Sequence, residues 1–417
     1  MKKILLVFGT RPEAIKMAPV VLRLREAGVF DTRVAVTAQH RQMLDQVLDL
    51  FNIKPDYDLD IMSPDQDLFD ITGRALAGLK EVLLGEQPDL ILVHGDTTTT
   101  FVAALAAFYL KIPVGHVEAG LRTRDKYRPF PEELNRRLAG ALTDYHFAPT
   151  QWARDNLVAE GVPPENIWVT GNTVIDALQI VADRVQSEKA VWEEYLAGQY
   201  GLSLDGRRLV LVTGHRRENF GPGFENICLA LRDIADHYPD THIVYPVHLN
   251  PNVQRPVYEI LSVTQVAPKA GLSSCMMETA NGSRISLLPP LEYAPFVYLL
   301  SQSYLVLTDS GGIQEEAPAL GKPVLVMREV TERPEGVWAK TVKLVGTDRE
   351  RIFCEVKEFL DNSASYQAMA QARNPYGDGQ AAKRIVQILA QVMGEDLQPE
   401  RYPEQFFPGE QGCETKW

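Results

Sequence analysis

Short apolar runs alternate with amphipathic stretches along most of the chain, and this alternation constrains the fold more than any other feature. A first cycle contains the apolar runs KILLVFGT, TRVAVTA, DLILVHGD, PVGHVEAG and YHFAPT. A second cycle begins at Arg208 with RLVLVTGH and continues with THIVYPVH, SRISLLPP, YLVLTDS and KPVLVMR. Strands that alternate with helices form parallel sheets with helices on both faces. The sequence therefore predicts an α/β protein with two doubly wound, Rossmann-like domains that face a cleft.

The same pattern predicts the domain boundaries. We expect an N-terminal domain over 1–172, a helical and charged connector over 173–206, a second domain over 207–372 and a closing helix over 373–394. Residues 263–283 are poor in apolar periodicity, which predicts a surface loop inserted into the second domain. Residues 395–417 lack a core-forming pattern, which predicts a mobile tail.

Composition excludes several classes of protein. The formal net charge of -13 argues against binding to nucleic acid or to an anionic membrane, because both reward a basic face. No apolar run approaches the roughly 20 residues that a membrane-spanning helix needs. The four cysteines have no metal-site spacing, and four thiols in a chain of 417 residues favour a reducing cytoplasm. We therefore expect a cytoplasmic protein without a metal site.

The most informative stretch runs from Leu307 to Glu335, where an apolar strand ends in a Ser-Gly-Gly turn. Ser310, Gly311 and Gly312 open a helix there, and backbone N–H groups at a helix N-terminus bind phosphate. Glu316 follows about one turn later and is placed to reach a ribose hydroxyl. A Gly-Gly pair alone is equally compatible with an ordinary strand-to-helix loop, so the other strand ends are needed to decide.

Polar residues follow the other strands as well, and ligands of open parallel sheets bind at these carboxyl ends. Each position has a simpler interpretation: Arg11 as a solvated residue beside Pro12, Asp96 as a helix cap, and Arg136 as the surface partner of Glu132 at i+4. Taken together, the polar residues at the strand ends favour a ligand-binding site. The charged or titratable residues at these ends are Arg11, Glu13, Lys16, His94, Asp96, His116, Glu118, Arg122, Arg128 and Glu132 in the first cycle, and His215, Arg216, Arg217, Glu218, His248, Asp309, Glu316, Arg328 and Arg333 in the second.

Two common nucleotide-binding motifs are missing from the sequence. The first strand-to-helix turn, FGTRPEA, has no G-x-G-x-x-G fingerprint, and no G-x-x-x-x-G-K-[ST] loop occurs anywhere. A redox dinucleotide and a P-loop are therefore not indicated. A pyrophosphate site together with the three carboxylates Asp96, Glu118 and Glu132 indicates a nucleotide-sugar enzyme.

At this point the chain closely resembles a known family, the bacterial non-hydrolysing UDP-N-acetylglucosamine 2-epimerases. The matching runs include GTRPEAIKMAP, HGDTTTTFVAALAAFY, PFPEELNRRLAG, TGHRRENFG and TDSGGIQEEAPALGKPVLVMREVTERPEG, and the similarity covers most of Lys2 to Met393. The resemblance implies a glycosyltransferase-B type architecture and a homodimer. It also implies interconversion of UDP-GlcNAc and UDP-ManNAc with neither NAD nor a metal.

The resemblance implies a role for each matching residue. Asp96, Glu118, Glu132, His215 and Lys16 would be catalytic. Substrate would be bound by Arg11, Lys16, Asp96, Glu118, Arg136, His215, Arg216, Phe296, Ser310, Gly311, Gly312, Glu316 and Arg333, with Phe296 near the uracil. Gln39, Gln42 and Gln66 match an activating second site for UDP-GlcNAc, although Asp65 stands where some relatives have Arg.

Other activities remain open on the residues alone. A hydrolysing 2-epimerase would release ManNAc and UDP, a glycosyltransferase of the same architecture would need an acceptor, and a UDP-GlcNAc sensor would bind without catalysis. We expect reversible epimerisation at C2 by elimination and re-addition of UDP through a 2-acetamidoglucal.

Overall fold

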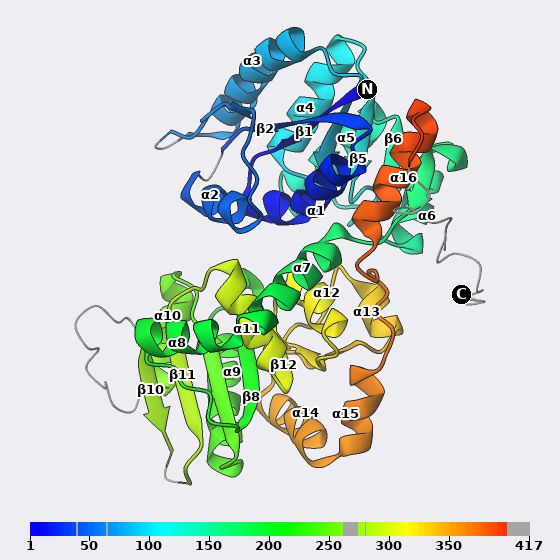
Figure 1. The fold of residues 1–417 in the computed structure, drawn as a ribbon. Helices are drawn as coiled ribbons and strands as arrows, with labels where there is room; N and C mark the ends of the chain where they lie inside the picture. Colours follow the sequence, from blue (N-terminus) through cyan, green and yellow to red (C-terminus); the bar gives the residue numbers. More distant parts are fainter. Residues whose placement is uncertain (39–40, 64–65, 262–273, 280, 398–417) are drawn as a thin grey trace. The chain divides into compact units, whose positions relative to one another are not determined.

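The computed structural model describes residues 1–38, 41–63, 66–261, 274–279 and 281–397. The chain divides into two compact units, one formed by Met1–Ala177 with Tyr376–Trp417 and the other by Leu178–Pro375. Figure 1 shows a sheet with flanking helices in each unit. The prediction of two doubly wound α/β units is confirmed.

The first unit is built on a parallel sheet with the strand order β3-β2-β1-β4-β5-β6-β7. These strands span Tyr57–Asp58, Phe30–Val36, Lys2–Phe8, Leu90–His94, Val114–Val117, Tyr145–Ala148 and Ile167–Val169. The central strand β1 is buried on both faces, as its unbroken run of aliphatic residues predicts.

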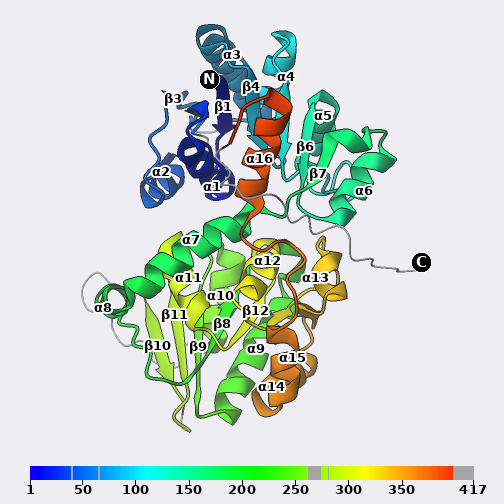
Figure 2. The same ribbon diagram turned by 45° about the vertical axis from the view of Figure 1, so that its right-hand side comes forward.

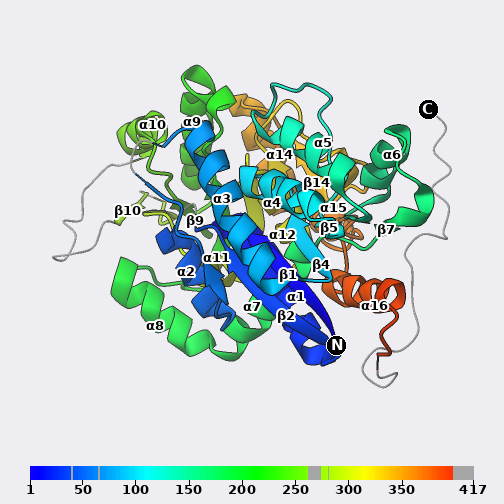
Figure 3. The same cartoon turned by 90° about the horizontal axis from the view of Figure 1, so that it is seen from above.

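Helices cover both faces of this sheet. Helices α3 (Leu68–Glu86), α4 (Thr98–Tyr109) and α5 (Glu132–Leu142) pack side by side on one face (Figure 3). Helix α1 (Arg11–Ala27) contacts α2 (Arg41–Leu50) and α16 (Ala381–Met393) on the other face (Figure 2). Helix α6 (Gln151–Ala159) connects β6 to β7.

The second unit has a seven-stranded sheet with the order β10-β11-β9-β8-β12-β13-β14, within the described part of the chain. The strands span Cys275–Glu278, Arg284–Leu288, Thr241–Pro246, Arg208–Thr213, Leu305–Thr308, Val324–Val326 and Val342–Leu344. All neighbouring pairs are parallel except β10 with β11. Strand β10 lies inside the segment 263–283 that the sequence predicts to be a loop, so this part of the prediction is wrong.

The helices of the second unit begin with α8 (Lys189–Tyr200). They continue with α9 (Pro222–His237), α10 (Pro251–Leu261), α11 (Tyr293–Gln302), α12 (Gly311–Ala319), α13 (Pro334–Trp338), α14 (Arg349–Asp361) and α15 (Ser363–Ala370). Helix α7 (Thr173–Ser187) contains the division between the units at Ala177. Among the described residues, no helix combines the length and the apolar character needed to cross a membrane.

The predicted closing helix corresponds to α16, which belongs to the first unit. The apolar stripe of α16 is buried at Ala382, Ile385, Ile388 and Leu389. The predicted tail lies almost entirely outside the described residues.

Candidate functional site

In the first unit, the turn between β1 and α1 is organised by a buried carboxylate. Oε2 of Glu13 accepts hydrogen bonds from the backbone N–H groups of Gly9, at 3.0 Å, and Thr10, at 2.8 Å. A Cβ at Gly9 would lie 2.0 Å from Oγ1 of Thr37, so the turn requires glycine at this position. This turn starts α1 at Arg11 and brings Lys16, on the second turn of the helix, to the carboxyl end of the sheet.

Glu118 lies at the end of β5 and is paired with two basic groups. Its Oε2 contacts Nζ of Lys16, and Nε2 of His94 lies 3.4 Å away. Burial alone would raise the pKa of Glu118, but Lys16 and His94 outweigh burial and hold its pKa well below the usual value. The side chain of Glu118 is therefore an ionised carboxylate that holds the Lys16 ammonium.

Asp96 is bound by Arg136 of α5. Its Oδ2 accepts hydrogen bonds from Nε of Arg136, at 2.9 Å, and from Nη2, at 2.6 Å. The alternative that Asp96 caps α4 does not hold, because Thr97 is the N-cap and accepts from the N–H of Thr100. The partners of Arg136 are Asp96 and Glu133, and the surface pair with Glu132 does not form.

Glu133 is a component of this cluster that the sequence analysis missed. Its side chain is fully buried, and it accepts hydrogen bonds from the N–H groups of Thr123 and Arg124 and from Nη1 of Arg136, at 3.3 Å. Glu133 thus ties the loop after β5 to the arginine that holds Asp96. The i,i+3 spacing of Glu133 and Arg136 was the available sequence signal.

Glu132, the first residue of α5, is placed differently from Asp96 and Glu118. Its Oε2 is buried and has no hydrogen-bond partner among the described residues. Buried carboxylate oxygens normally have partners, so this oxygen is available to a proton or a ligand hydroxyl. The first unit therefore offers three carboxylates in three different environments.

His116, at the end of β5, has a structural role. Burial lowers the pKa of His116 to about 3, although its hydrogen bond to Gly95 acts in the opposite direction. The neutral ring donates from Nε2 to the Gly95 carbonyl at 2.7 Å, which holds the loop that carries Asp96.

In the second unit, the N-terminus of α12 has a basic group against it. Ser310 is the N-cap, and a Cβ at Gly311 would lie 2.5 Å from Nη1 of Arg333. Nε of Arg333 also donates to the buried Glu315. The first turn of α12 therefore combines free backbone N–H groups with a guanidinium that is held in place, an arrangement suited to an anionic diphosphate.

Glu316 lies one turn into α12, as the sequence predicts for an acid near a ribose. Its Oε1 accepts a hydrogen bond from the hydroxyl of Tyr293 at 2.8 Å. Its Oε2 would lie 3.7 Å from a Cβ at Gly312. Phe296 is half-buried on α11, the helix that also carries Tyr293.

His215 and Arg216 follow β8 and are bound to the end of β12 by Asp309. The fully buried carboxylate of Asp309 accepts from the N–H of His215, at 2.9 Å to Oδ2, and from the N–H of Arg216, at 2.8 Å. In the sequence, Asp309 is recognisable only as a charged residue at a strand end. Its function as the anchor of His215 depends on tertiary contacts that no local pattern reveals.

The predicted activating site is described only in part. Gln39 and Asp65 lie outside the described residues, and Gln42 lies in α2. Oε1 of Gln66 accepts a hydrogen bond from the N–H of Ser63 at 3.0 Å. The second site therefore stays a prediction.

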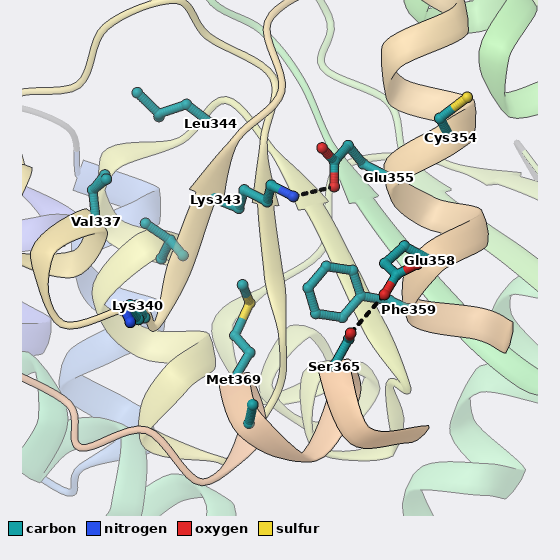
Figure 4. Close-up of a pocket in the computed structure, with 12 residues that line it drawn as sticks. Val337, Lys340, Lys343, Leu344, Cys354, Glu355, Glu358, Phe359, Ser365 and Met369 are labelled. Atoms are coloured by element: carbon teal, nitrogen blue, oxygen red, sulfur yellow. Dashed lines mark hydrogen bonds and ion pairs between the residues drawn. The ribbon is translucent and has the colours of Figure 1, made fainter. Parts of the chain in front are cut away.

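A cavity of about 850 Å³ lies in the second unit beside the edge strand β14 (Figure 4). Three of the charged groups that line it pair with neighbouring lining groups, Lys343 with Glu355 at 2.5 Å and Glu358 with Ser365 at 2.6 Å. None of the residues that line it is a predicted site residue. The candidate site is therefore assigned to the strand ends.

Known proteins with similar sequences identify the family of this chain. The family model described as UDP-N-acetylglucosamine 2-epimerase matches residues 22–390. The UDP-N-acetylglucosamine 2-epimerase of Escherichia coli (strain K12) is 57% identical over 387 residues, which cover 93% of this chain and 98% of that protein. The relative from Campylobacter jejuni is 53% identical and is covered to 97%.

Solved structures give the same result. The crystal structure of UDP-GlcNAc 2-epimerase from Neisseria meningitidis bound to UDP-GlcNAc is 49% identical, with a TM-score of 0.81 and coverage of 93% of this chain and 100% of that one. The Methanocaldococcus jannaschii UDP-GlcNAc 2-epimerase in complex with UDP-GlcNAc and UDP is 32% identical, with a TM-score of 0.71 and coverage of 93% and 99%. The fold, the strand-end residues and these similarities together show that this chain belongs to the UDP-N-acetylglucosamine 2-epimerase family.

Proposed function

We propose that this protein interconverts UDP-N-acetylglucosamine and UDP-N-acetylmannosamine. The observation that carries the proposal is that the chain contains two kinds of site, one in each unit. One is a helix N-terminus with Arg333 against it, suited to a diphosphate, and the other is a set of carboxylates suited to moving protons. Relatives crystallised with UDP-GlcNAc or UDP support the choice of ligand.

The chemistry requires an indirect route. The proton on C2 of a bound N-acetylhexosamine is not acidic, because no carbonyl adjoins C2. In the proposed route, a carboxylate takes the C2 proton, the electrons of the C2–H bond form a C1=C2 double bond, and the electrons of the C1–O bond leave with UDP. UDP then adds back to C1 of the 2-acetamidoglucal, and a proton is delivered to C2 on the opposite face.

Both halves of this route have candidate residues. Negative charge that develops on the departing diphosphate is stabilised by the α12 N-terminus and by Arg333, Arg216 and His215, since preorganised donors are often the largest contribution to catalysis. Proton removal and delivery occur on opposite faces of the sugar, so two acids or bases are required. We assign these steps to Asp96, Glu118 and Glu132, supported by Lys16, with Arg11, Arg136, Glu316 and Phe296 as binding residues.

The direct test is turnover in heavy water without added NAD. The product is expected to acquire deuterium at C2, because the C2 proton is lost to a carboxylate and replaced from solvent. Retention of the original hydrogen would refute elimination and favour an internal hydride transfer.

The same incubation separates the competing functions. A 2-epimerase of the non-hydrolysing type leaves the sugar linked to UDP, whereas the hydrolysing type releases free ManNAc and UDP. A sensor binds UDP-GlcNAc and leaves it unchanged, and a glycosyltransferase releases UDP only when an acceptor is present. Proton NMR of UDP-GlcNAc incubated with the purified protein distinguishes all four outcomes.

We also propose that the protein acts as a homodimer in the cytoplasm. Phe108 and Tyr109, at the end of α4, are 58% and 65% exposed, and Leu134 and Leu138 on the adjacent α5 are also exposed. Exposed apolar groups on neighbouring helices are typical of an interface between copies. Light scattering after size exclusion tests the dimer, and a monomer at micromolar concentration would contradict it.

A further inference from the structure

Asp309 has an unusual set of contacts for a residue that precedes an anion site. Its carboxylate is 0% exposed and accepts from two backbone N–H groups and from Nδ2 of Asn219, at 3.2 Å. All of these contacts are donors, so both carboxylate oxygens serve as acceptors. A buried carboxyl group therefore lies directly before Ser310, the N-cap of α12.

The ring of His215 contacts the same carboxylate. Nδ1 of His215 lies 3.5 Å from Oδ1 of Asp309, while the side chain is 40% exposed. The ring also stacks on His248, with 5.4 Å between the centroids. Arg216 and His248 are therefore the other charged or titratable groups that face His215, in addition to Asp309.

The position of Asp309 determines which ring nitrogen faces a ligand. An Nδ1–H directed at Asp309 leaves Nε2 on the far side of the ring. In a neutral ring, Nε2 is then an acceptor and repels a phosphate oxygen, whereas an imidazolium donates from both nitrogens. The ring can therefore donate hydrogen bonds to both Asp309 and a phosphate only after it gains a proton.

In the free protein, the surroundings of His215 favour the neutral form of its ring. Burial lowers the pKa of His215, Asp309 acts against burial, and the Arg216 cation lowers the pKa further. A diphosphate bound at the α12 N-terminus would add negative charge near the ring, and this charge favours the imidazolium.

We propose that His215 takes up one proton from solvent when a nucleoside diphosphate binds at the α12 N-terminus, and that Asp309 is the positioning residue that holds the resulting imidazolium. The inference deepens the proposed function and rests on its UDP site. No bond other than N–H is made or broken in this step, and the buffer supplies the proton. The imidazolium then donates from Nε2 to a phosphate oxygen as UDP departs.

The test is isothermal titration of the full chain with UDP in buffers that differ in ionisation enthalpy. The titration is done at about pH 8, well above the second phosphate pKa of about 6, so that UDP itself releases or binds few protons. The slope of binding enthalpy against ionisation enthalpy gives the proton count, which is expected to be on the order of one proton taken up. Affinity should fall by up to about tenfold per pH unit as pH rises through this range.

Three variants test whether His215 is the group that takes up the proton. His215→Gln should bind UDP without proton uptake, and Asp309→Asn should lose most of the uptake and bind roughly tenfold more weakly, as expected for the loss of a charge-assisted hydrogen bond. His237→Gln, at an exposed histidine of α9, is the matched control and should keep the uptake. If Asp309→Asn does not fold, NMR titration of His215 in the unmodified protein replaces it, and the pKa of His215 should rise when UDP binds.

The outcomes separate this inference from the proposed function. Failure of UDP to bind at millimolar concentration would refute the proposed UDP site and the inference with it. UDP binding with a buffer-independent enthalpy, or proton uptake that persists in His215→Gln, would refute the inference alone.

Discussion

In the first unit, neighbouring side chains place three carboxylates in chemically different environments. Glu118 is kept ionised by Lys16 and His94, while Oε2 of Glu132 is buried without a partner among the described residues. Glu118 also has a positive φ of 61°, a strained conformation that non-glycine residues rarely adopt outside functional sites. We infer that Glu118 fixes Lys16 and that Glu132 is better placed to exchange a proton.

Replacing Lys16 with methionine tests the ion pair. In the parent protein the lowered pKa of Glu118 contributes stability above the unfolded pKa of about 4.3, and this contribution is lost as pH falls. In Lys16→Met the buried Glu118 has lost its strongest cation, so the free energy of unfolding near pH 7 should fall by roughly 3 kcal/mol. Urea unfolding at about pH 7.5 and pH 5 measures this.

The sign of the pH dependence is the decisive part of that prediction. Burial without Lys16 should raise the pKa of Glu118, so the deficit of the variant should shrink as pH falls. The double variant Lys16→Met with Glu118→Gln should recover stability near neutral pH, since the buried charge is gone. An equal deficit at both pH values would contradict the role given to the pair.

Replacing Gly311 with alanine tests the diphosphate site. The new Cβ would lie 2.5 Å from Nη1 of Arg333, so the guanidinium must move away from the α12 N-terminus. We expect UDP binding to weaken roughly tenfold, as for the loss of a charge-assisted hydrogen bond. Calorimetric titration with UDP measures this.

A double-mutant cycle supplies the control for Gly311. Arg333→Gln should weaken UDP binding to a similar degree, and adding Gly311→Ala to it should have little further effect, because both changes remove the same contact. Fully additive losses would show that Gly311 acts independently of Arg333.

At the scale of elements, α16 is attached to the first unit through α7. The buried carboxylate of Asp176 accepts from the N–H groups of Ala381, at 3.1 Å, and Ala382, at 2.9 Å, and so caps α16. Arg384 donates to the Thr170 carbonyl at 3.0 Å and adds a second attachment. Together with the buried apolar stripe of α16, these bonds fix the returning chain.

Replacing Asp176 tests a pH dependence of stability that is opposite in sign to that of most carboxylates. Burial raises the pKa of Asp176 to about 6, against the opposing effect of its backbone hydrogen bonds. A raised pKa in the folded state stabilises the protein at low pH, and this contribution disappears as pH rises through about 6. The free energy of unfolding of Asp176→Asn, compared with that of the parent, should therefore rise by roughly 3 kcal/mol as pH increases from about 4 to about 7. Denaturant unfolding across that range measures the difference, and a constant difference would contradict the raised pKa.

The elements also show what sequence can and cannot predict. The closing helix predicted over 373–394 contains α16, Ala381–Met393, because apolar residues at helical spacing determine a helix locally. Strand β10 was missed because four residues at a sheet edge, paired only with β11, carry little local pattern. The strand-end positions of the predicted site residues follow from topology. Glu133 has only the i,i+3 spacing to Arg136 as a local signal, and Asp309 could not be assigned because its partners come from a distant loop.

At the scale of the whole molecule, the second unit is an insertion into the first. It occupies Leu178–Pro375, from a point within α7 to the return of the chain at Tyr376. The two passages lie together inside the first unit, where the N–H of Asn172 donates to the carbonyl of Tyr376 at 2.6 Å. A Cβ at Gly171 would lie 3.3 Å from the Cα of Gly377, so both glycines permit this close approach.

Fragments test this organisation. Residues 178–375 form a continuous unit with a buried core of their own and should unfold cooperatively when expressed alone. Residues 1–177 lack α16 and should become stably folded only when a peptide covering 376–397 is added, which circular dichroism and thermal unfolding measure. Cooperative unfolding of 1–177 without the peptide would show that α16 is dispensable.

The adjacency of Asn172 and Tyr376 has a consequence for protein engineering. Because the chain leaves and re-enters the first unit at one point, the intervening segment behaves as a removable cassette. A short linker between residues 177 and 376 should close the scaffold as a single uninterrupted polypeptide, and the equivalent cassette of a relative could be grafted at the same junction.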